Sequence, residues 1–360
     1  MNKTKFSINK FSATVLPLII LILFTLLLIH PDVSFEYMKN SLKLCVRGLV
    51  PSLFPFMVIS DFLISGNYGG VLKTTLGKII SLVFGTSTEG SFSVLLGFLC
   101  GFPIGAKIAV KLYSENRISY KEFCHIMSFC NIPSPAFLCG SVGVMFNNRA
   151  FGVILLVCVI ISSCIMGIIG RVFYRYDKKC SPVSATESKV CTAFTDAVKS
   201  SASVMLCVCG YVVFFSVIIG YVTALCDRLN LPRFISVILS GFFEISNGMS
   251  SASVSGLGIF SLVLAGFFAG FSGLSVIFQI ISLDSKDYIN KKVFILQKLL
   301  MGLISAFVTF ISLKVFPLQI SPSAPTLERV TFESYGLYVC ILFFISAILP
   351  ILAAKTQKHP

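Results

Sequence analysis

The first residue with the chemistry to bind a solute is a lysine inside an apolar stretch. Lys107 follows a glycine–phenylalanine–proline run at 101–103 and has apolar neighbours on both sides. A charge within a membrane segment is costly and is usually retained for a function. Its ammonium could bind a small organic anion. The alternative is a lysine near a helix end whose stem lies in lipid while its charge reaches water, as does that of Lys111 one turn later.

A second candidate site combines polar side chains with prolines. Asn131 and Ser134 stand in a run that also holds Pro133 and Pro135. Proline interrupts helical hydrogen bonding, and a helix start offers free N–H groups to anions. Both side chains could therefore bind carboxylate oxygens, although Asn and Ser are also ordinary helix caps. In the second half of the chain, the expected counterparts are Ser272 and Gln279.

The acidic candidates are Asp61 and Glu244, either of which could pair with Lys107 or carry a coupling proton. Glu244 and Asn247 belong to a run bounded by glycines, which favours a binding role for both. Asp61 stands near the end of its apolar run, where placement at the membrane interface is an equal alternative. His125 could titrate near neutral pH, but it borders a polar stretch, and we favour a packing role.

Motifs for enzymatic chemistry are missing from the sequence. It has no HExxH pair and no GxxxxGK[ST] loop. Most of the 13 cysteines stand in apolar runs, and no matched CxxC pairs suggest zinc. We therefore expect a protein that is not an enzyme, with free thiols, no catalytic residues, no metal and no cofactor. Without a nucleotide site, transport would draw on a gradient or on the substrate's own concentration.

Composition places these candidates in a membrane protein. Apolar residues make up 56% of the 360 residues, charged residues 12%, and the mean hydropathy is +0.91. A soluble domain carries about 25% charged residues, so lipid must be the solvent of this chain. Its net charge of +14 is scattered between apolar runs. That pattern is typical of charges that orient membrane helices, and it excludes nucleic acid as the expected partner.

The apolar runs predict an all-α polytopic membrane protein with interrupted helices. The run at 11–29 predicts a retained first helix rather than a cleaved signal peptide, because no small-x-small site follows it. The loop at 171–199 holds six basic and three acidic residues. We place this loop and both termini in the cytoplasm. The other expected segments are a kinked helix at 45–65, an amphipathic piece at 69–88, broken segments at 91–113, 125–146 and 255–283, and apolar stretches at 150–170, 202–226, 234–248, 293–313 and 335–353.

The interruptions recur in both halves of the chain. A break at 101 is followed about thirty residues later by one at 131, and the breaks at 241 and 270 repeat this order. Paired interrupted segments indicate a transporter site at the interface of two repeats. We expect two transporter-like repeats of inverted topology whose four breaks share one central site. The predicted parts are a first helix and connection at 1–44, a first gate-like repeat at 45–170, a cytoplasmic loop at 171–199, a second gate-like repeat at 200–316, and a C-terminal helix and tail at 317–360.

These motifs resemble a known family. GFPIGAK at 101–107 and SFCNIPSPAFLCGSVGVMF at 128–146 are similar to the YlbJ family of sporulation integral membrane proteins. GFFEISNG at 241–248 and FSGLSVIFQ at 271–279 fit the same pattern. The resemblance covers about residues 40–310. It implies a nucleoside-recognition or gate domain, named for a likeness to concentrative nucleoside transporters, and a role in endospore formation.

The resemblance also implies a substrate, which composition and spacing do not identify. It is dipicolinic acid, moved across the outer forespore membrane from the mother cell towards the spore. The leading interpretation is thus a carrier of a small organic anion in the lipid bilayer. A nucleoside-type small-solute transporter is the alternative, and Lys107 favours an anion over a neutral nucleoside. A non-transporting scaffold for spore assembly is the third interpretation. Association into a homo-oligomer is left open.

Overall fold

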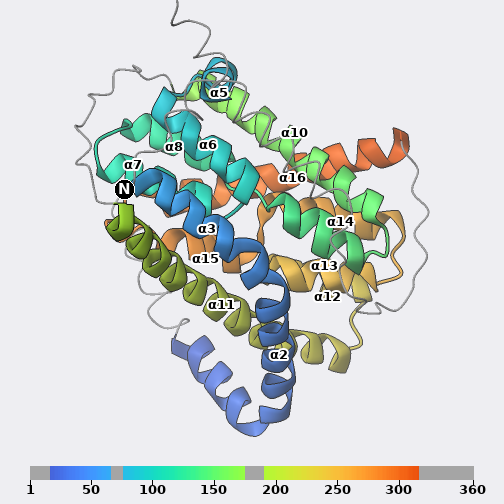
Figure 1. The fold of residues 1–360 in the computed structure, drawn as a ribbon. Helices are drawn as coiled ribbons and strands as arrows, with labels where there is room; N and C mark the ends of the chain where they lie inside the picture. The colour runs from blue at the N-terminus through green and yellow to red at the C-terminus, as the bar shows by residue number, and fades with distance from the viewer. Residues whose placement is uncertain (1–16, 66–75, 175–189, 316–360) are drawn as a thin grey trace, which may run out of the picture.

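The computed structural model describes residues 17–65, 76–174 and 190–315, and every regular element in these ranges is a helix (Figure 1). Five of the helices are long and apolar enough to cross a membrane, and a sixth span results if the bent pair at 76–100 is counted as one. The prediction of an all-α polytopic membrane protein is confirmed. The predicted C-terminal helix at 335–353 lies outside the described residues.

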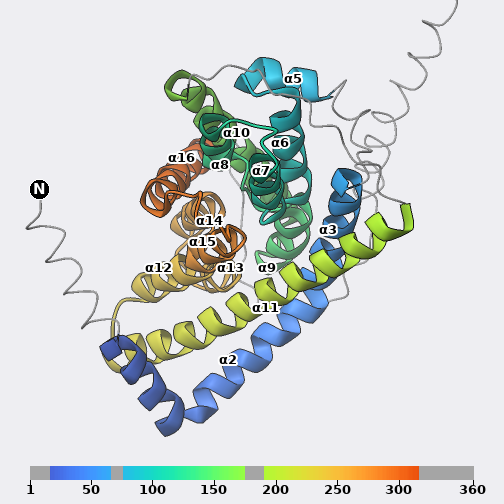
Figure 2. The same cartoon turned by 90° about the vertical axis from the view of Figure 1, so that its left-hand side faces the viewer.

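The N-terminal part forms a long arm. A short apolar helix over Pro17–Ile29 precedes it in the chain. Pro51 and Pro55 lack the N–H groups that an α-helix needs, and a π-helical turn directly before them absorbs the irregularity. The predicted kinked helix at 45–65 is therefore this π turn and the helix after it. Figure 2 shows the arm lying along α11. The elements are α2 (Pro31–Leu44), η1 (Cys45–Leu49), α3 (Val50–Ser65) and α11 (Val190–Arg228).

The first structural unit contains a hairpin, a broken helix and a long helix. The hairpin turns at 101–103, and Gly97 and Gly105 let its two helices touch through their backbones. The segment predicted to be broken at 125–146 is interrupted at 130–135. The elements are α5 (Leu76–Phe84), α6 (Thr88–Cys100), α7 (Ile104–Ser114), α8 (Tyr120–Phe129), η2 (Ala136–Val142), α9 (Gly143–Met145) and α10 (Arg149–Phe173).

The second unit repeats this order. Its hairpin turns at Glu244, three residues after the predicted break at Gly241. Gly241 lies inside a helix instead, where its backbone touches that of Gly248. The predicted break at 270–273 is present at Ser272. The elements are α12 (Arg233–Phe243), α13 (Ile245–Ser253), α14 (Ile259–Phe271), α15 (Gly273–Ser282) and α16 (Lys291–Val315).

The two units run in opposite directions. Tyr113, at the end of α7, meets Tyr288 from the α15–α16 connection with ring centroids 4.7 Å apart, and it lies 5.7 Å from the ring of Tyr120 at the start of α8. The broken helix of the first unit therefore begins where that of the second unit ends. Such an antiparallel pair is the arrangement of inverted repeats. The residue boundaries proposed for the two repeats stay a prediction.

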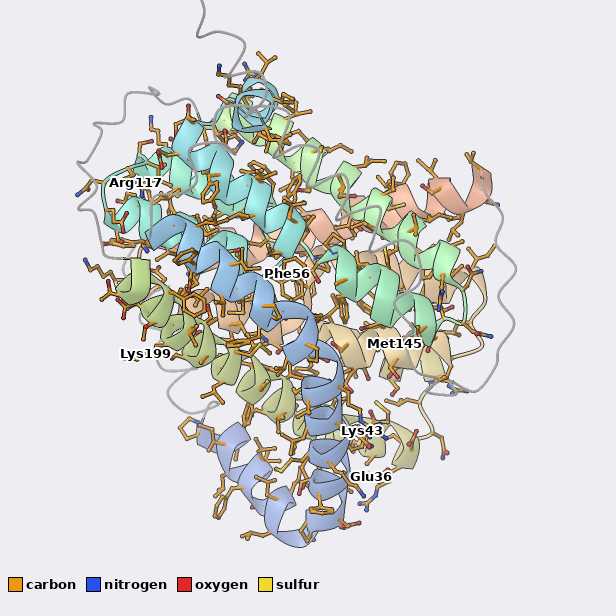
Figure 3. The ribbon with its side chains drawn as sticks, in the orientation of Figure 1. Glu36, Lys43, Phe56, Arg117, Met145 and Lys199 are labelled. Atoms are coloured by element: carbon orange, nitrogen blue, oxygen red, sulfur yellow. The ribbon has the colours of Figure 1, made fainter. Side chains whose placement is uncertain are left out.

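The end of the molecule that carries these tyrosines also carries basic side chains. Arg117 and Lys199 both lie there (Figure 3). Tyr174, where α10 ends, accepts a hydrogen bond from Gln297 at the same end. The loop predicted to be cytoplasmic connects to this end, although residues 175–189 lie outside the described ranges. The positive-inside rule assigns this end to the cytoplasm.

This assignment predicts opposite labelling at two cysteines placed in a cysteine-free variant. Ser184→Cys should stay unlabelled by an impermeant maleimide applied to intact cells, because the positive-inside rule predicts a cytoplasmic loop. Leu231→Cys, in the connection between α11 and α12 at the opposite end, should be labelled. Both positions should react after permeabilisation, which controls for accessibility. Labelling of Ser184→Cys in intact cells would contradict the assignment.

Candidate functional site

A pocket lies where the interrupted helices of both units meet. The pocket is small: the empty space between its walls, open solvent included, is about 390 Å³. Its walls come from the first hairpin tip, the two broken helices, the second hairpin tip, η1, α3 and α11. The lining residues are Leu49, Leu53, Phe102, Ser134, Phe137, Val208, Val212, Glu244, Ile245, Ser246, Val276 and Gln279.

The two breaks of the first unit are in direct contact. The N–H of Phe102 donates to the carbonyl of Ile132 at 2.9 Å. Gly101 has φ +78°, and a Cβ at this position would overlap the backbone of Ser134. Only glycine adopts this conformation readily and leaves that space free. The glycine therefore lets the hairpin tip dock onto the broken helix.

Of the predicted pair Asn131 and Ser134, only Ser134 lines the pocket. Ser134 lines the pocket, where its hydroxyl also accepts a hydrogen bond from the N–H of Phe137 at 3.2 Å. Asn131 is buried outside the pocket lining. Its Nδ2 donates to the carbonyl of Met127 at 3.3 Å, while its Oδ1 has no hydrogen-bond partner among the described residues. Ser134 thus serves as both cap and pocket wall.

Glu244 forms the tip of the second hairpin and lines the pocket. Its extended backbone places the carboxylate over the start of α13, where it accepts hydrogen bonds from the N–H groups of Ser246 at 3.0 Å and Asn247 at 2.8 Å. This is an N-cap, which satisfies the free donors of a helix start. Asn247 connects the tip to α11, because its Nδ2 also donates to the hydroxyl of Ser216 at 2.7 Å.

Of the remaining candidates in the second half, one lines the pocket and one does not. Gln279 lines the pocket; its Nε2 donates to Ser275 Oγ at 3.1 Å, and its Oε1 is buried without a partner among the described residues. Ser272 is fully buried at the α14–α15 break, in a left-handed conformation with φ +74°. It does not line the pocket.

A fully buried lysine next to the pocket is absent from the sequence candidates. The Nζ of Lys298, on α16, donates to the carbonyl of Asn131 at 2.5 Å and to Ser272 Oγ at 3.0 Å. It also reaches the carbonyl of Gly270 at 3.4 Å. Lys298 therefore joins the broken helices of both units. Its sequence signal is a single lysine within the apolar stretch predicted at 293–313, the same signal that singles out Lys107.

The structure places Lys107 away from the pocket lining and gives it a carboxylate partner. Its ammonium forms a salt bridge with Asp61 on α3, and Asp61 also accepts a hydrogen bond from the hydroxyl of Ser201 on α11 at 3.1 Å. Lys107 is thus held in an ion pair outside the pocket lining, and its contact with the solute stays a prediction. The pairing of Asp61 with Lys107 is one of the predicted alternatives. His125 is buried against the carbonyl of Gly167, which fits its packing role.

No family model matches the chain. The chain is similar to YlbJ. This sporulation integral membrane protein of Bacillus subtilis is 28% identical over an alignment of 336 residues, which covers 83% of this chain and 82% of YlbJ. Two solved structures of CNTnw also align, one inward-facing and substrate-bound (TM-score 0.48, 12% identity, 89% of this chain and 88% of that one) and one of a doubly substituted, outward-facing variant (TM-score 0.49, 14% identity, 88% of each).

The site lies between the two units. Its walls are mostly apolar, and its few polar groups come from hairpin tips and helix breaks, as in transporter sites built from discontinuous helices. Among the described residues, no cluster of His, Cys, Asp and Glu could hold a metal ion.

Proposed function

We propose that this chain is a transporter, not an enzyme, which moves a small organic anion across the membrane during sporulation. The proposed substrate is dipicolinic acid, and the proposed location is the outer forespore membrane, with movement from the mother cell towards the spore. The observation that carries the proposal is the pocket at which the breaks of two inverted units meet. The similarity to a sporulation membrane protein supports the physiological setting.

The pocket has features that suit an aromatic dicarboxylate. Phe102 and Phe137 offer apolar surface to a flat ring. Helices α7 and α15 begin at the breaks without a side-chain cap. Their first N–H groups and their dipoles favour negative charge. Ser134 adds a hydroxyl to the same wall.

Glu244 constrains how a dianion would pass. A carboxylate in the pocket wall would repel an anionic solute in a site of low dielectric constant. We therefore assign a proton to Glu244 while the solute is bound, so that solute and proton move together. This gives the buried carboxylate of the hairpin tip the coupling role that its position in the glycine-bounded run suggests.

A neutral nucleoside-type solute is the second candidate. The observation in its favour is the unpartnered Oε1 of Gln279, because a buried acceptor is satisfied by a ligand with an N–H or O–H donor. A dicarboxylate in its dianionic form offers no such donor. Competition by nucleosides against dipicolinate uptake in proteoliposomes would separate the two candidates.

We predict that a deletion strain forms spores with strongly reduced dipicolinate and that the wild-type chain restores it. Gln279→Leu should restore at most about a tenth of the wild-type level, because it removes the second amide N–H, which we propose donates to a carboxylate of the solute, and loss of one such hydrogen bond in a buried site costs roughly 1–3 kcal/mol. The control is Gln297→Leu, the same change on α16 outside the pocket lining. Dipicolinate in purified spores is the measurement, with protein levels checked by immunoblot. Normal dipicolinate in the deletion strain would contradict the proposed substrate.

A further inference from the structure

We propose that the ammonium of Lys298 occupies a cation site between the two broken helices and takes the place of a coupling metal ion. The coupling role rests on the proposed function. The cation site itself rests on geometry, and its test needs no solute. The consequence is a carrier that works without sodium.

The ligands of this ammonium are those of a cation site. Two are backbone carbonyls at helix breaks, of Asn131 and Gly270, and the third is the hydroxyl of Ser272. In carriers with discontinuous helices, unwound carbonyls of this kind coordinate Na⁺. Among the described residues, no carboxylate forms an ion pair with Lys298. Oxygen dipoles therefore compensate the buried charge, as they would for a bound metal ion.

Two helix ends add to the attraction. Gly270 stands in the last turn of α14, and Asn131 follows the end of α8 by two residues. The carbonyl end of a helix carries partial negative charge, which favours a nearby cation. The ammonium of Lys298 lies where both ends converge, and these ends belong to different units. A cation at this point holds the two broken helices together.

Small residues let Lys298 reach this position. Gly266 and Gly270 on α14 pack against Thr309, Ser305 and Gly302 on α16, so that the two backbones approach closely. Figure 1 shows the two helices side by side. This is the packing of membrane helices through small residues. The close approach of α16 to α14 brings the side chain of Lys298 within reach of the break.

The first unit has no equivalent of this lysine. Its long helix, α10, supports the end of α8 through a hydroxyl: Ser163 Oγ donates to the carbonyl of Phe129 at 2.6 Å. The apolar residue Leu156 stands seven positions into α10, as Lys298 does in α16. Within the described residues, only the second unit therefore has such a lysine. The two inverted units differ at this point.

The test measures thermal unfolding of the purified full-length protein in detergent, in NaCl, KCl or choline chloride at equal ionic strength. Wild-type protein should unfold at the same temperature in all three salts, because its site is already filled. Lys298→Ala should unfold at a lower temperature in choline, and NaCl or KCl should raise it by a few degrees with saturation. Lys298→Met retains the apolar stem without the charge and should gain little from either salt.

Lys292→Ala is the matched control, because Lys292 is exposed on the same helix. It should behave as the wild type in every salt. A folded Lys298→Ala variant with the same unfolding temperature in all three salts would overturn the proposal. If that variant does not fold, the wild type decides: specific stabilisation by Na⁺ would show that a metal ion, not Lys298, fills the cation site. Neither result depends on dipicolinate, so the proposed function and this inference fail separately.

Discussion

Replacing Gly101 with alanine is expected to abolish accumulation of folded protein in the membrane. Gly101 has φ +78°, and an added Cβ would overlap the backbone nitrogen of Ser134. A backbone atom cannot move aside as a flexible side chain can, so the hairpin tip and the broken helix must separate. Strain at positive φ adds about 1–2 kcal/mol. We expect a total loss of roughly 3 kcal/mol or more, measured as loss of the monodisperse peak in detergent and of signal on immunoblots.

The matched control is Gly140→Ala. Gly140 lies in η2 of the same unit, and a Cβ there would meet no atom within 4 Å. Alanine at this position should leave stability unchanged within about 0.5 kcal/mol or raise it slightly, because it restricts the unfolded chain. Accumulation of Gly101→Ala at the level of Gly140→Ala, with the same peak, would contradict the contact between the two breaks of the first unit.

The interruptions could be predicted because their signals are local. Gly101, Pro103 and Pro133 break helices through their own backbone properties, and the structure has breaks at these places. Gly241 shows the limit of this reasoning. Its neighbours predict a break, yet it lies inside α12 and provides close contact with Gly248. A glycine that ends a helix and one that lets two helices touch look alike in a single sequence.

The partners of the buried charges could not be predicted from local patterns. Asp61 and Lys107 are 46 positions apart, and Lys298 reaches a carbonyl 167 positions away. Apolar neighbours identify Lys107 as a costly charge, and the same signal applies to Lys298. Only the packing of α3 against the first unit, and of α16 against both breaks, decides which charge is paired with a carboxylate and which is held by carbonyls.

The ion pair predicts a specific pattern in a double-mutant cycle. The side chains of Lys107 and Asp61 are only 16% and 10% exposed. Removing one partner leaves an uncompensated buried charge, which costs roughly 3–5 kcal/mol. Lys107→Gln and Asp61→Asn should each lower the unfolding temperature and accumulation strongly. The double variant should recover most of the loss, because neither charge remains.

Measuring spore dipicolinate in the same variants distinguishes a structural role of Lys107 from solute binding. If Lys107 acts only through Asp61, the double variant should also restore spore dipicolinate to at least half of the wild-type level. If the ammonium binds the solute, as its sequence position suggests, the double variant should accumulate but leave the spores without dipicolinate. Ser201→Ala is the graded control, because it removes one hydrogen bond to Asp61 and should cost only about 1 kcal/mol. The pair joins α7 to α3, and through Ser201 to α11, so we expect it to anchor the first hairpin to these two helices.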